Sequence, residues 1–204
     1  MEMSGSQRRI QTGVLGGSFN PVHVGHLMLA SYLAQFTDLD EVWLMLSPAN
    51  PLKVRTDDVT DCQRLAMLRI ACEGHRGVIE CDVELTMPRP SYSIDSLSRL
   101  SELHPDRDFR LIVGSDNWLI FDRWRAYEEI IRRFRPIIYP RPGYPVDAST
   151  LPVGVTMVNA PVADVSSTFI RSAIAEGKDM GAFLPAGVAG YIEENGLYCA
   201  DETL

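Results

Sequence analysis

The feature that most constrains the fold is a segment rich in glycine and histidine that joins two apolar runs. Residues 10–15 are short enough for a buried strand, whereas residues 27–34 have the pattern of a helix packed on a sheet. The segment between them, residues 16–26, reads Gly-Gly-Ser-Phe-Asn-Pro-Val-His-Val-Gly-His. Glycines after a strand let the backbone approach a ligand closely, and the free N–H groups at a helix N-terminus favour a phosphate. The sequence therefore predicts a phosphate-binding turn in which His23 and His26 are side-chain donors.

Two other interpretations of the histidines are a zinc site and a glycine-rich turn with unrelated surface histidines. A zinc site would need a third ligand in tetrahedral geometry. The remaining histidines, His75 and His104, are isolated in the sequence, and there is no His-Glu-x-x-His pattern. We therefore expect a polyanion site without a dedicated set of metal ligands.

A second polar segment lies near the C-terminus and reads Val-Ser-Ser-Thr-Phe-Ile-Arg over residues 165–171. Ser166 is a good N-cap for a helix that continues over residues 167–176. Ser167 and Arg171 are four residues apart and so share one face of that helix. Hydroxyls, N–H groups and a guanidinium on one face could hold the outer phosphates of a nucleoside triphosphate. Taken alone, the same pattern also suits a plain helix start.

Strand-like and helix-like segments alternate along the whole chain. The expected strands cover residues 10–15, 42–46, 78–81, 109–113, 136–139 and 155–158. The expected helices cover residues 27–34, 62–72, 93–103, 167–176 and 188–194. This alternation predicts an α/β fold with a mostly parallel sheet flanked by helices and with ligands at the carboxyl ends of the strands. The long polar loop over residues 47–60 is a candidate substrate loop.

Composition restricts the classes of function. A net charge of −8 argues against general nucleic-acid binding, which needs a positive field. No apolar run approaches the roughly 20 residues that span a membrane. The four cysteines show no Cys-x-x-Cys spacing, so we expect reduced thiols and a cytoplasmic location. Residues 1–9 are polar and are expected to be a flexible segment before a single domain over residues 10–204.

Both polar segments resemble signatures of the nucleotidylyltransferase superfamily, whose members transfer a nucleotide from ATP or CTP to a phosphorylated acceptor. The second resembles its ISSTxIR motif and the first its GxFxPxHxGH motif, with matches at Gly17, Phe19, Pro21, His23, Gly25 and His26. Asn20 stands where the superfamily often has Asp. The resemblance implies a single Rossmann-like nucleotidyltransferase domain over residues 10–204.

Over nearly the whole chain the resemblance is closest to the bacterial nicotinate mononucleotide adenylyltransferase family. It implies ATP and nicotinate mononucleotide as substrates, with Mg²⁺ held mainly by the ATP phosphates. It implies direct in-line attack by the acceptor phosphate on the α-phosphorus, with pyrophosphate leaving. The chain departs from the family at Leu52, where a His is usual, which leaves Asn50 and Lys53 as the expected phosphate contacts. The oligomeric state is not indicated.

The resemblance also implies roles for individual residues. Catalysis is assigned to His23, His26 and Arg171. ATP contacts are expected from Gly16, Gly17, Ser18, Phe19, Gly25, Gly114, Asp116, Ser166 and Ser167. Contacts to the acceptor are expected from Asn50, Lys53, Tyr92, Ser93, Trp124, Arg125 and Arg141.

Several of these roles have simpler alternatives. Trp124 is expected to stack on the pyridine ring, whose carboxylate would be received by backbone N–H groups near Ser93 and Arg125. Packing inside the protein is the alternative for Trp124 and for Tyr92. Asp116 is expected to contact the ribose or a metal-bound water, and a helix cap is its alternative.

The function also has alternatives. Nicotinamide mononucleotide or phosphopantetheine could be the acceptor in place of nicotinate mononucleotide. A non-catalytic nucleotide-binding module is a further possibility, although His23, His26 and Arg171 are all present.

Overall fold

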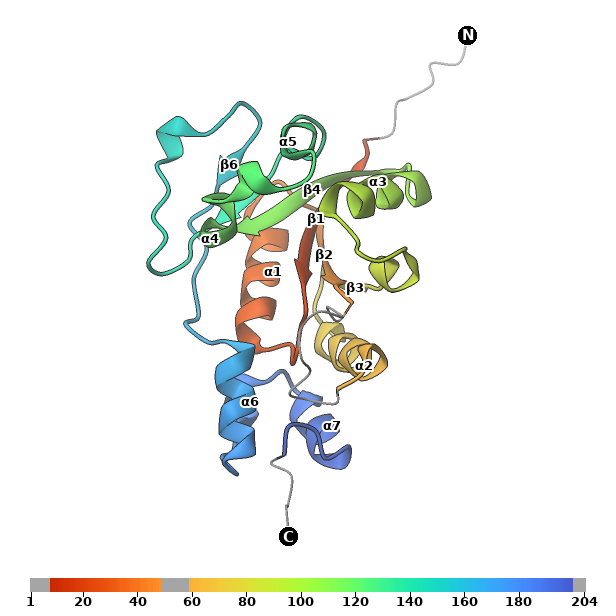
Figure 1. Cartoon of the computed structure of the whole chain (residues 1–204), viewed down its shortest axis with the longest axis vertical. Helices are drawn as coiled ribbons and strands as arrows, with labels where there is room; N and C mark the ends of the chain where they lie inside the picture. Colours follow the sequence, from red (N-terminus) through yellow and green to blue (C-terminus); the bar gives the residue numbers. More distant parts are fainter. Residues whose placement is uncertain (1–7, 49–58, 200–204) are drawn as a thin grey trace.

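A computed structural model describes residues 8–48 and 59–199 and has a six-stranded sheet at its centre (Figure 1). The strands run in the order β3-β2-β1-β4-β5-β6, and every neighbouring pair is parallel. Their bounds are β1 Ile10–Gly17, β2 Glu41–Leu46, β3 Val78–Cys81, β4 Arg107–Gly114, β5 Ile137–Tyr139 and β6 Thr156–Met157. The predicted α/β fold with a parallel sheet is confirmed.

Helices connect the strands and follow the sheet at the C-terminal end of the chain. Their bounds are α1 Val24–Phe36, α2 Asp61–Cys72, α3 Ser93–Leu103, α4 Ser115–Trp118, α5 Tyr127–Phe134, α6 Ser167–Ala175 and α7 Val188–Glu194. Short 3-10 turns are η1 Val83–Thr86, η2 Phe121–Arg123, η3 Ala148–Thr150 and η4 Gly181–Phe183. In the described part of the chain, no helix has both the length and the apolar character needed to cross a membrane.

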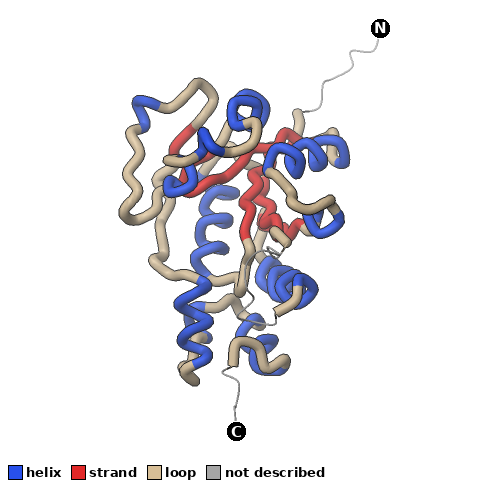
Figure 2. Tube along the Cα trace, viewed as in Figure 1, coloured by secondary structure: helices blue, strands red, loops and turns tan. Residues whose placement is uncertain are grey.

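The sheet separates two apolar cores, because successive side chains of a strand point to opposite faces. Leu44 and Leu46 of β2 face the core formed with α1, α2, α6 and α7. Trp43 and Met45 of the same strand face the core formed with α3 and α5. Figure 2 shows the strands as a central red layer with blue helices on both sides. Both faces of the sheet are therefore covered, as a parallel sheet requires.

The boundary between β1 and α1 differs from the sequence prediction. Gly16 and Gly17 pair with Met45 and Leu46 of β2, so both glycines belong to the strand and not to the turn. The helix then begins at Val24, three residues before the predicted start, and His23 is its N-cap. The turn is consequently confined to residues 18–23, and both histidines of the motif lie at the first turn of α1.

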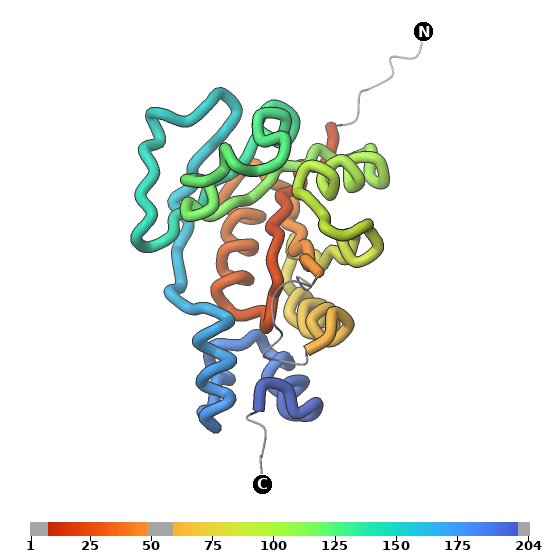
Figure 3. Tube along the Cα trace, viewed as in Figure 1, coloured from red at the N-terminus to blue at the C-terminus, as the bar shows by residue number. Residues whose placement is uncertain are grey.

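The segments near the two ends of the chain lie at opposite ends of the first strand (Figure 3). Residues 1–7 of the expected flexible segment lie outside the described residues, whereas Arg8 and Arg9 form ion pairs with Asp40 and Asp108, both at 3.2 Å. At the other end, the C-terminal helices, blue in Figure 3, lie beyond the carboxyl end of the red first strand. This arrangement brings the second sequence motif to the first.

Candidate active site

The predicted nucleotide-binding residues gather at the carboxyl ends of the central strands. β1 ends at Gly17, β4 ends at Gly114, and β5 ends at Tyr139. The turn after β1, the short helix α4 after β4 and the segment after β5 therefore meet at one edge of the sheet. Ligands of open parallel sheets bind at this edge.

His23 and His26, the histidine pair, stack on each other at the start of α1. Their ring centroids are 3.7 Å apart and the ring planes differ by 25°. The backbone N–H of His23 donates to Nδ1 of His26 at 3.2 Å. Because that bond occupies Nδ1, neutral His26 carries its proton on Nε2 and can donate it to a ligand. The Nδ1 atom of His23 is buried and has no hydrogen-bond partner among the described residues.

The environment keeps the histidine pair neutral. Burial and, to a smaller extent, the nearby positive charge of Arg141 lower the pKa of His23 from 6.5 to about 4. Burial also lowers the pKa of His26 well below 6.5, with smaller contributions from His23 and Arg141. Both rings are therefore hydrogen-bond donors and not fixed cations at neutral pH. A bound phosphate would raise both pKa values by supplying negative charge.

Two neighbours of the histidine pair explain motif positions that were expected to contact ATP. A Cβ atom at Gly25 would lie 3.1 Å from Nδ1 of His23, so glycine leaves room for the ring. Phe19 is 2% exposed, and its ring meets that of His26 edge-on with centroids 4.9 Å apart. The ring is inserted into the core and supports the histidine pair, and the expected ATP contact of Phe19 stays a prediction. Its φ of 43° turns the chain inward there.

The C-terminal motif holds the turn between β1 and α1. Ser167 Oγ donates to the carbonyl oxygen of Pro21 at 2.9 Å, and Arg171 Nη1 donates to that of Asn20 at 2.8 Å. Ser166 is the N-cap of α6 as predicted, and its hydroxyl accepts the backbone N–H of Phe169 at 3.2 Å. The two motifs thus meet in space. The hydrogen bonds just described for Ser167 and Arg171 go to backbone carbonyl oxygens of the first motif.

The end of β4 supplies an acidic and a basic side chain. Asp116 lies inside α4, whose N-cap is Gly114, so the helix-cap interpretation of Asp116 is wrong. Its Oδ1 atom is buried without a hydrogen bond among the described residues and lies 3.7 Å from Nε of Arg141. A Cβ atom at Gly114 would come within 2.3 Å of the same oxygen. The backbone N–H of Arg141 donates to Ser115 Oγ at 2.9 Å, and its positive charge acts on both histidines.

The residues expected around the pyridine ring lie at the start of α3 and after η2. Tyr92 is the N-cap of α3 and is 41% exposed, so its alternative as a core residue is wrong. The guanidinium of Arg125 lies 4.8 Å above the Tyr92 ring and 3.5 Å from Asp95. Ser93 is the first residue of the helix, where backbone N–H groups have no helical partner.

Trp124 packs on the core, as its alternative interpretation expects, and its stacking on the pyridine ring stays a prediction. Its ring is half-buried and lies against Phe121, with centroids 5.0 Å apart, and Trp118 stacks on the same Phe121 ring at 5.0 Å. Trp124 thus packs on the core with part of its surface still exposed. Asn50 and Lys53, the expected phosphate contacts, lie outside the described residues.

Sequence reasoning missed Arg64 and Tyr198. Arg64 is 2% exposed and donates to the carbonyl oxygens of Ser18 and Ser47, the latter at 3.0 Å. Tyr198 donates from its hydroxyl to Oδ1 of Asn20 at 2.6 Å. A signal for Arg64 was available, because it begins the apolar stripe of α2 that continues with Met67, Leu68, Ala71 and Cys72. The sequence around Tyr198 carries no such signal.

No group of three or more His, Cys, Asp or Glu side chains in residues 8–48 and 59–199 is arranged to hold a metal ion.

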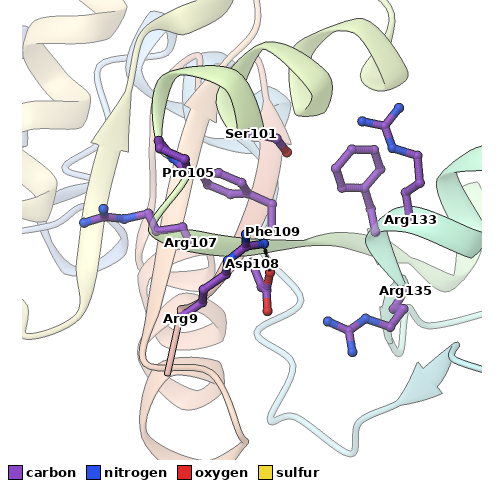
Figure 4. Close-up of a pocket in the computed structure, with 9 residues that line it drawn as sticks. Arg9, Ser101, Pro105, Arg107, Asp108, Phe109, Arg133 and Arg135 are labelled. Carbon is purple, nitrogen blue, oxygen red and sulfur yellow. Dashed lines mark hydrogen bonds and ion pairs between the residues drawn. The ribbon is translucent and has the colours of Figure 1, made fainter. Parts of the chain in front are cut away.

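A cavity of about 290 Å³ lies at the opposite edge of the sheet, near the starts of β1, β4 and β5 (Figure 4). Its lining includes Arg9, Asp108, Arg133 and Arg135. None of the residues predicted for the site lines this cavity. The candidate site is therefore the one at the carboxyl ends of the strands.

Comparison with known proteins agrees with this placement. The cytidylyltransferase-like family matches residues 14–173. A probable nicotinate-nucleotide adenylyltransferase of Bacteroides thetaiotaomicron is 50% identical over 194 residues, which cover 95% of this chain and 96% of that protein. One of Flavobacterium johnsoniae is 38% identical over 93% of this chain and 99% of its own. The chain therefore belongs to the cytidylyltransferase-like family, in its branch of nicotinate-nucleotide adenylyltransferases.

Solved structures support the fold at lower identity. The nicotinic acid mononucleotide adenylyltransferase of Plasmodium falciparum, in complex with NaAD, superposes with a TM-score of 0.73 at 20% identity. The match covers 93% of this chain and 97% of that one. The Rossmann-like arrangement of the sheet is thus shared by a distant relative.

The low pKa of His23 predicts a dependence of stability on pH. An unfolded chain takes up a proton at this histidine as the pH falls through 6.5, whereas the folded protein resists protonation until about pH 4. Acid therefore favours unfolding, and His23 should account for about 2 kcal/mol of lost stability between pH 7.5 and pH 5.

Urea denaturation at these two pH values should show a smaller loss for His23→Gln than for the wild type. His75→Gln is the matched control, because His75 is exposed. An unchanged pH dependence in His23→Gln would mean that this ring is not held neutral by the fold.

Proposed function

We propose that this chain transfers the AMP moiety of ATP to nicotinate mononucleotide, giving nicotinate adenine dinucleotide and pyrophosphate in NAD biosynthesis. The observation that carries the proposal is the histidine pair: two stacked, neutral rings at a helix N-terminus, beside the strand that ends in Gly17. The 50% identical relative supports the choice of acceptor. Residues 10–204 would act as one nucleotidylyltransferase domain.

The acceptor's 5′-phosphate is already ionised near neutral pH, so no general base is required. Its oxygen attacks the α-phosphorus in line, and the bond to the bridging oxygen of pyrophosphate breaks. Catalysis then consists of alignment and of stabilising the charge that develops on the phosphates. His26 would donate from Nε2 to the transferred phosphate, and His23 would donate beside it. The backbone of Gly16, Gly17 and Ser18 would approach the same group.

The leaving pyrophosphate would be held by the start of α6. Ser166 and Ser167 place hydroxyls and free N–H groups there, and Arg171 supplies the charge. Arg171 also donates to the carbonyl oxygen of Asn20 from Nη1. A guanidinium has five N–H donors, so one side chain can serve the turn and a phosphate together.

The acceptor would occupy the edge of the site formed by α3 and the segment after η2. Trp124 would stack its exposed part on the pyridine ring, with Tyr92 and Arg125 beside it. Backbone N–H groups near Ser93 and Arg125 would receive the nicotinate carboxylate, which would favour the acid over the amide. Asn50, Lys53 and Arg141 would contact the acceptor phosphate.

Mg²⁺ fits a site in which the phosphates supply most of its ligands, and it would neutralise charge on the leaving group. Oδ1 of Asp116, which is buried and has no hydrogen bond among residues 8–48 and 59–199, would accept one from a metal-bound water or from the ribose. We also propose a cytoplasmic location. All four cysteines are free thiols, and burial raises the pKa of Cys72 to about 12 and of Cys81 to about 11.

Pyrophosphate release tests the reaction and the acceptor together. The protein is given ATP and Mg²⁺ with nicotinate mononucleotide, nicotinamide mononucleotide or phosphopantetheine in separate assays. We expect strong turnover with the nicotinate nucleotide alone, because backbone N–H donors match a carboxylate. Turnover only with phosphopantetheine would reject the assigned acceptor, and ATP binding without any turnover would favour a binding module.

His26→Ala should lower kcat about a hundredfold or more, because it removes a donor to the reacting phosphate. The melting temperature should fall by only a few degrees, because the variant loses one hydrogen bond to the backbone N–H of His23 and one ring contact with Phe19. His75→Ala, on the exposed loop after α2, controls for the loss of an imidazole elsewhere. Wild-type turnover in His26→Ala would leave His26 as a packing residue of the turn.

Trp124→Ala should raise the KM for nicotinate mononucleotide about tenfold, because a stacking surface for the pyridine ring is lost. The KM for ATP should change less than twofold. Trp118→Ala is the matched control, since both rings lie 5.0 Å from Phe121 but Trp118 is not assigned to the acceptor. Equal effects of the two variants on both substrates would show that Trp124 acts through packing alone.

A further inference from the structure

Three charged side chains connect the two halves of the candidate site through α2. Arg64 belongs to α2, and its side chain is 3% exposed. Its Nη1 donates to the carbonyl oxygen of Ser18, in the turn after β1, and to that of Ser47, directly after β2. Its Nη2 lies 2.7 Å from Oδ1 of Asp61 in the first turn of the same helix.

Asp61 carries the connection onward with its other oxygen. Oδ2 lies 2.9 Å from Nη2 of Arg89, which is 46% exposed. Arg89 is three residues before Tyr92 and four before Ser93 in the sequence. Hydrogen bonds and ion pairs therefore connect Ser18, in the turn proposed to bind the triphosphate, to Arg89. The segment after Arg89 leads to Tyr92 and Ser93, which are proposed to bind the acceptor.

The chemistry of this group favours a fixed geometry. A buried cation is costly unless its donors are satisfied, and Arg64 has two carbonyls and one carboxylate as partners. The planar guanidinium holds these acceptors at set angles, which a lysine ammonium cannot do. Asp61 is also favoured by the positive end of the helix. The turn at Ser18 and the segment from Arg89 to Ser93 are thus both attached to the start of α2.

We propose that Arg64, Asp61 and Arg89 form a positioning relay that sets the distance between the bound ATP and the bound acceptor. In-line transfer depends steeply on such a distance, because a shift of about 1 Å can cost on the order of a hundredfold in rate. The three side chains act through the segments that they hold, so they are positioning residues. Since it concerns the same two substrates, this inference rests on the proposed function.

Three single variants test the relay through kcat, the two KM values and the melting temperature. Arg89→Gln should raise the KM for nicotinate mononucleotide about two- to fivefold and leave the KM for ATP and the melting temperature unchanged. Asp61→Asn should raise both KM values, because it weakens the hold on both segments. Arg64→Lys should lower kcat about tenfold or more, because one ammonium cannot hold three acceptors in place.

A double variant and a control on the same helix sharpen the test. Asp61→Asn combined with Arg89→Gln should have the acceptor KM of Asp61→Asn alone, because the two residues act in series. Arg69→Gln should leave all parameters unchanged, since Arg69 pairs with Glu80 and Asp82 away from the site. Wild-type KM values in Arg89→Gln and Asp61→Asn, or independent effects of the two changes, would overturn the relay.

Wild-type turnover separates this outcome from the proposed function. If the wild type releases pyrophosphate with nicotinate mononucleotide, the KM values of the variants decide on the relay. If it does not, the proposed function fails, and titration of ATP and nicotinate mononucleotide into the same variants supplies the dissociation constants. The same pattern is then expected in those constants: a weaker acceptor in Arg89→Gln, two weaker ligands in Asp61→Asn and no change in Arg69→Gln.

Discussion

The turn at Asn20 and Pro21 is held in place by side chains from the far end of the chain. Ser167 and Arg171 donate to its two carbonyl oxygens, and Tyr198 donates to the Asn20 side chain. Carbonyls in a tight turn have no partner in the sheet or the helix, so these donors satisfy groups that would otherwise stay unbonded. The position of the turn decides where α1 begins, and the start of α1 decides where the histidine pair lies. The chemistry at one end of the sequence thus depends on the folding of the other.

An acidic protein must hold anionic substrates against its own net charge of −8. Burial keeps the histidine pair neutral, so in the proposed site these two rings would act as hydrogen-bond donors and not as permanent cations. Neutral donors stabilise phosphate through directed hydrogen bonds, and their pKa values rise when negative charge arrives. The positive end of α1 acts at the same place. In the proposed reaction the local field would therefore become more favourable as charge develops on the phosphates, and such a difference between ground state and transition state accelerates a reaction.

The sequence allowed the parallel α/β architecture and the Ser166 cap to be predicted, because apolar periodicity and capping residues are local signals. It did not allow the end of β1 to be predicted, since Gly16 and Gly17 extend the strand only by pairing with β2. The buried ring of Phe19 is another effect of tertiary packing: a motif position expected to touch ATP supports the histidine pair from inside. Helix α4 has four residues, which are too few for a clear period. Spacing alone could not show which motif side chains face a ligand and which hold another segment.

Arg64 shows how a charge at a core position can reveal a function. A cation that begins the apolar stripe of a helix has a high cost of burial, and only strong acceptors offset it. Those acceptors are the carbonyls of Ser18 and Ser47 and the carboxylate of Asp61, which the sequence separates and the fold brings together. Motif searches find groups that touch a substrate. Residues that hold the substrate-binding segments in place belong to no motif. They can be recognised in the sequence when a charged residue stands in an otherwise apolar pattern.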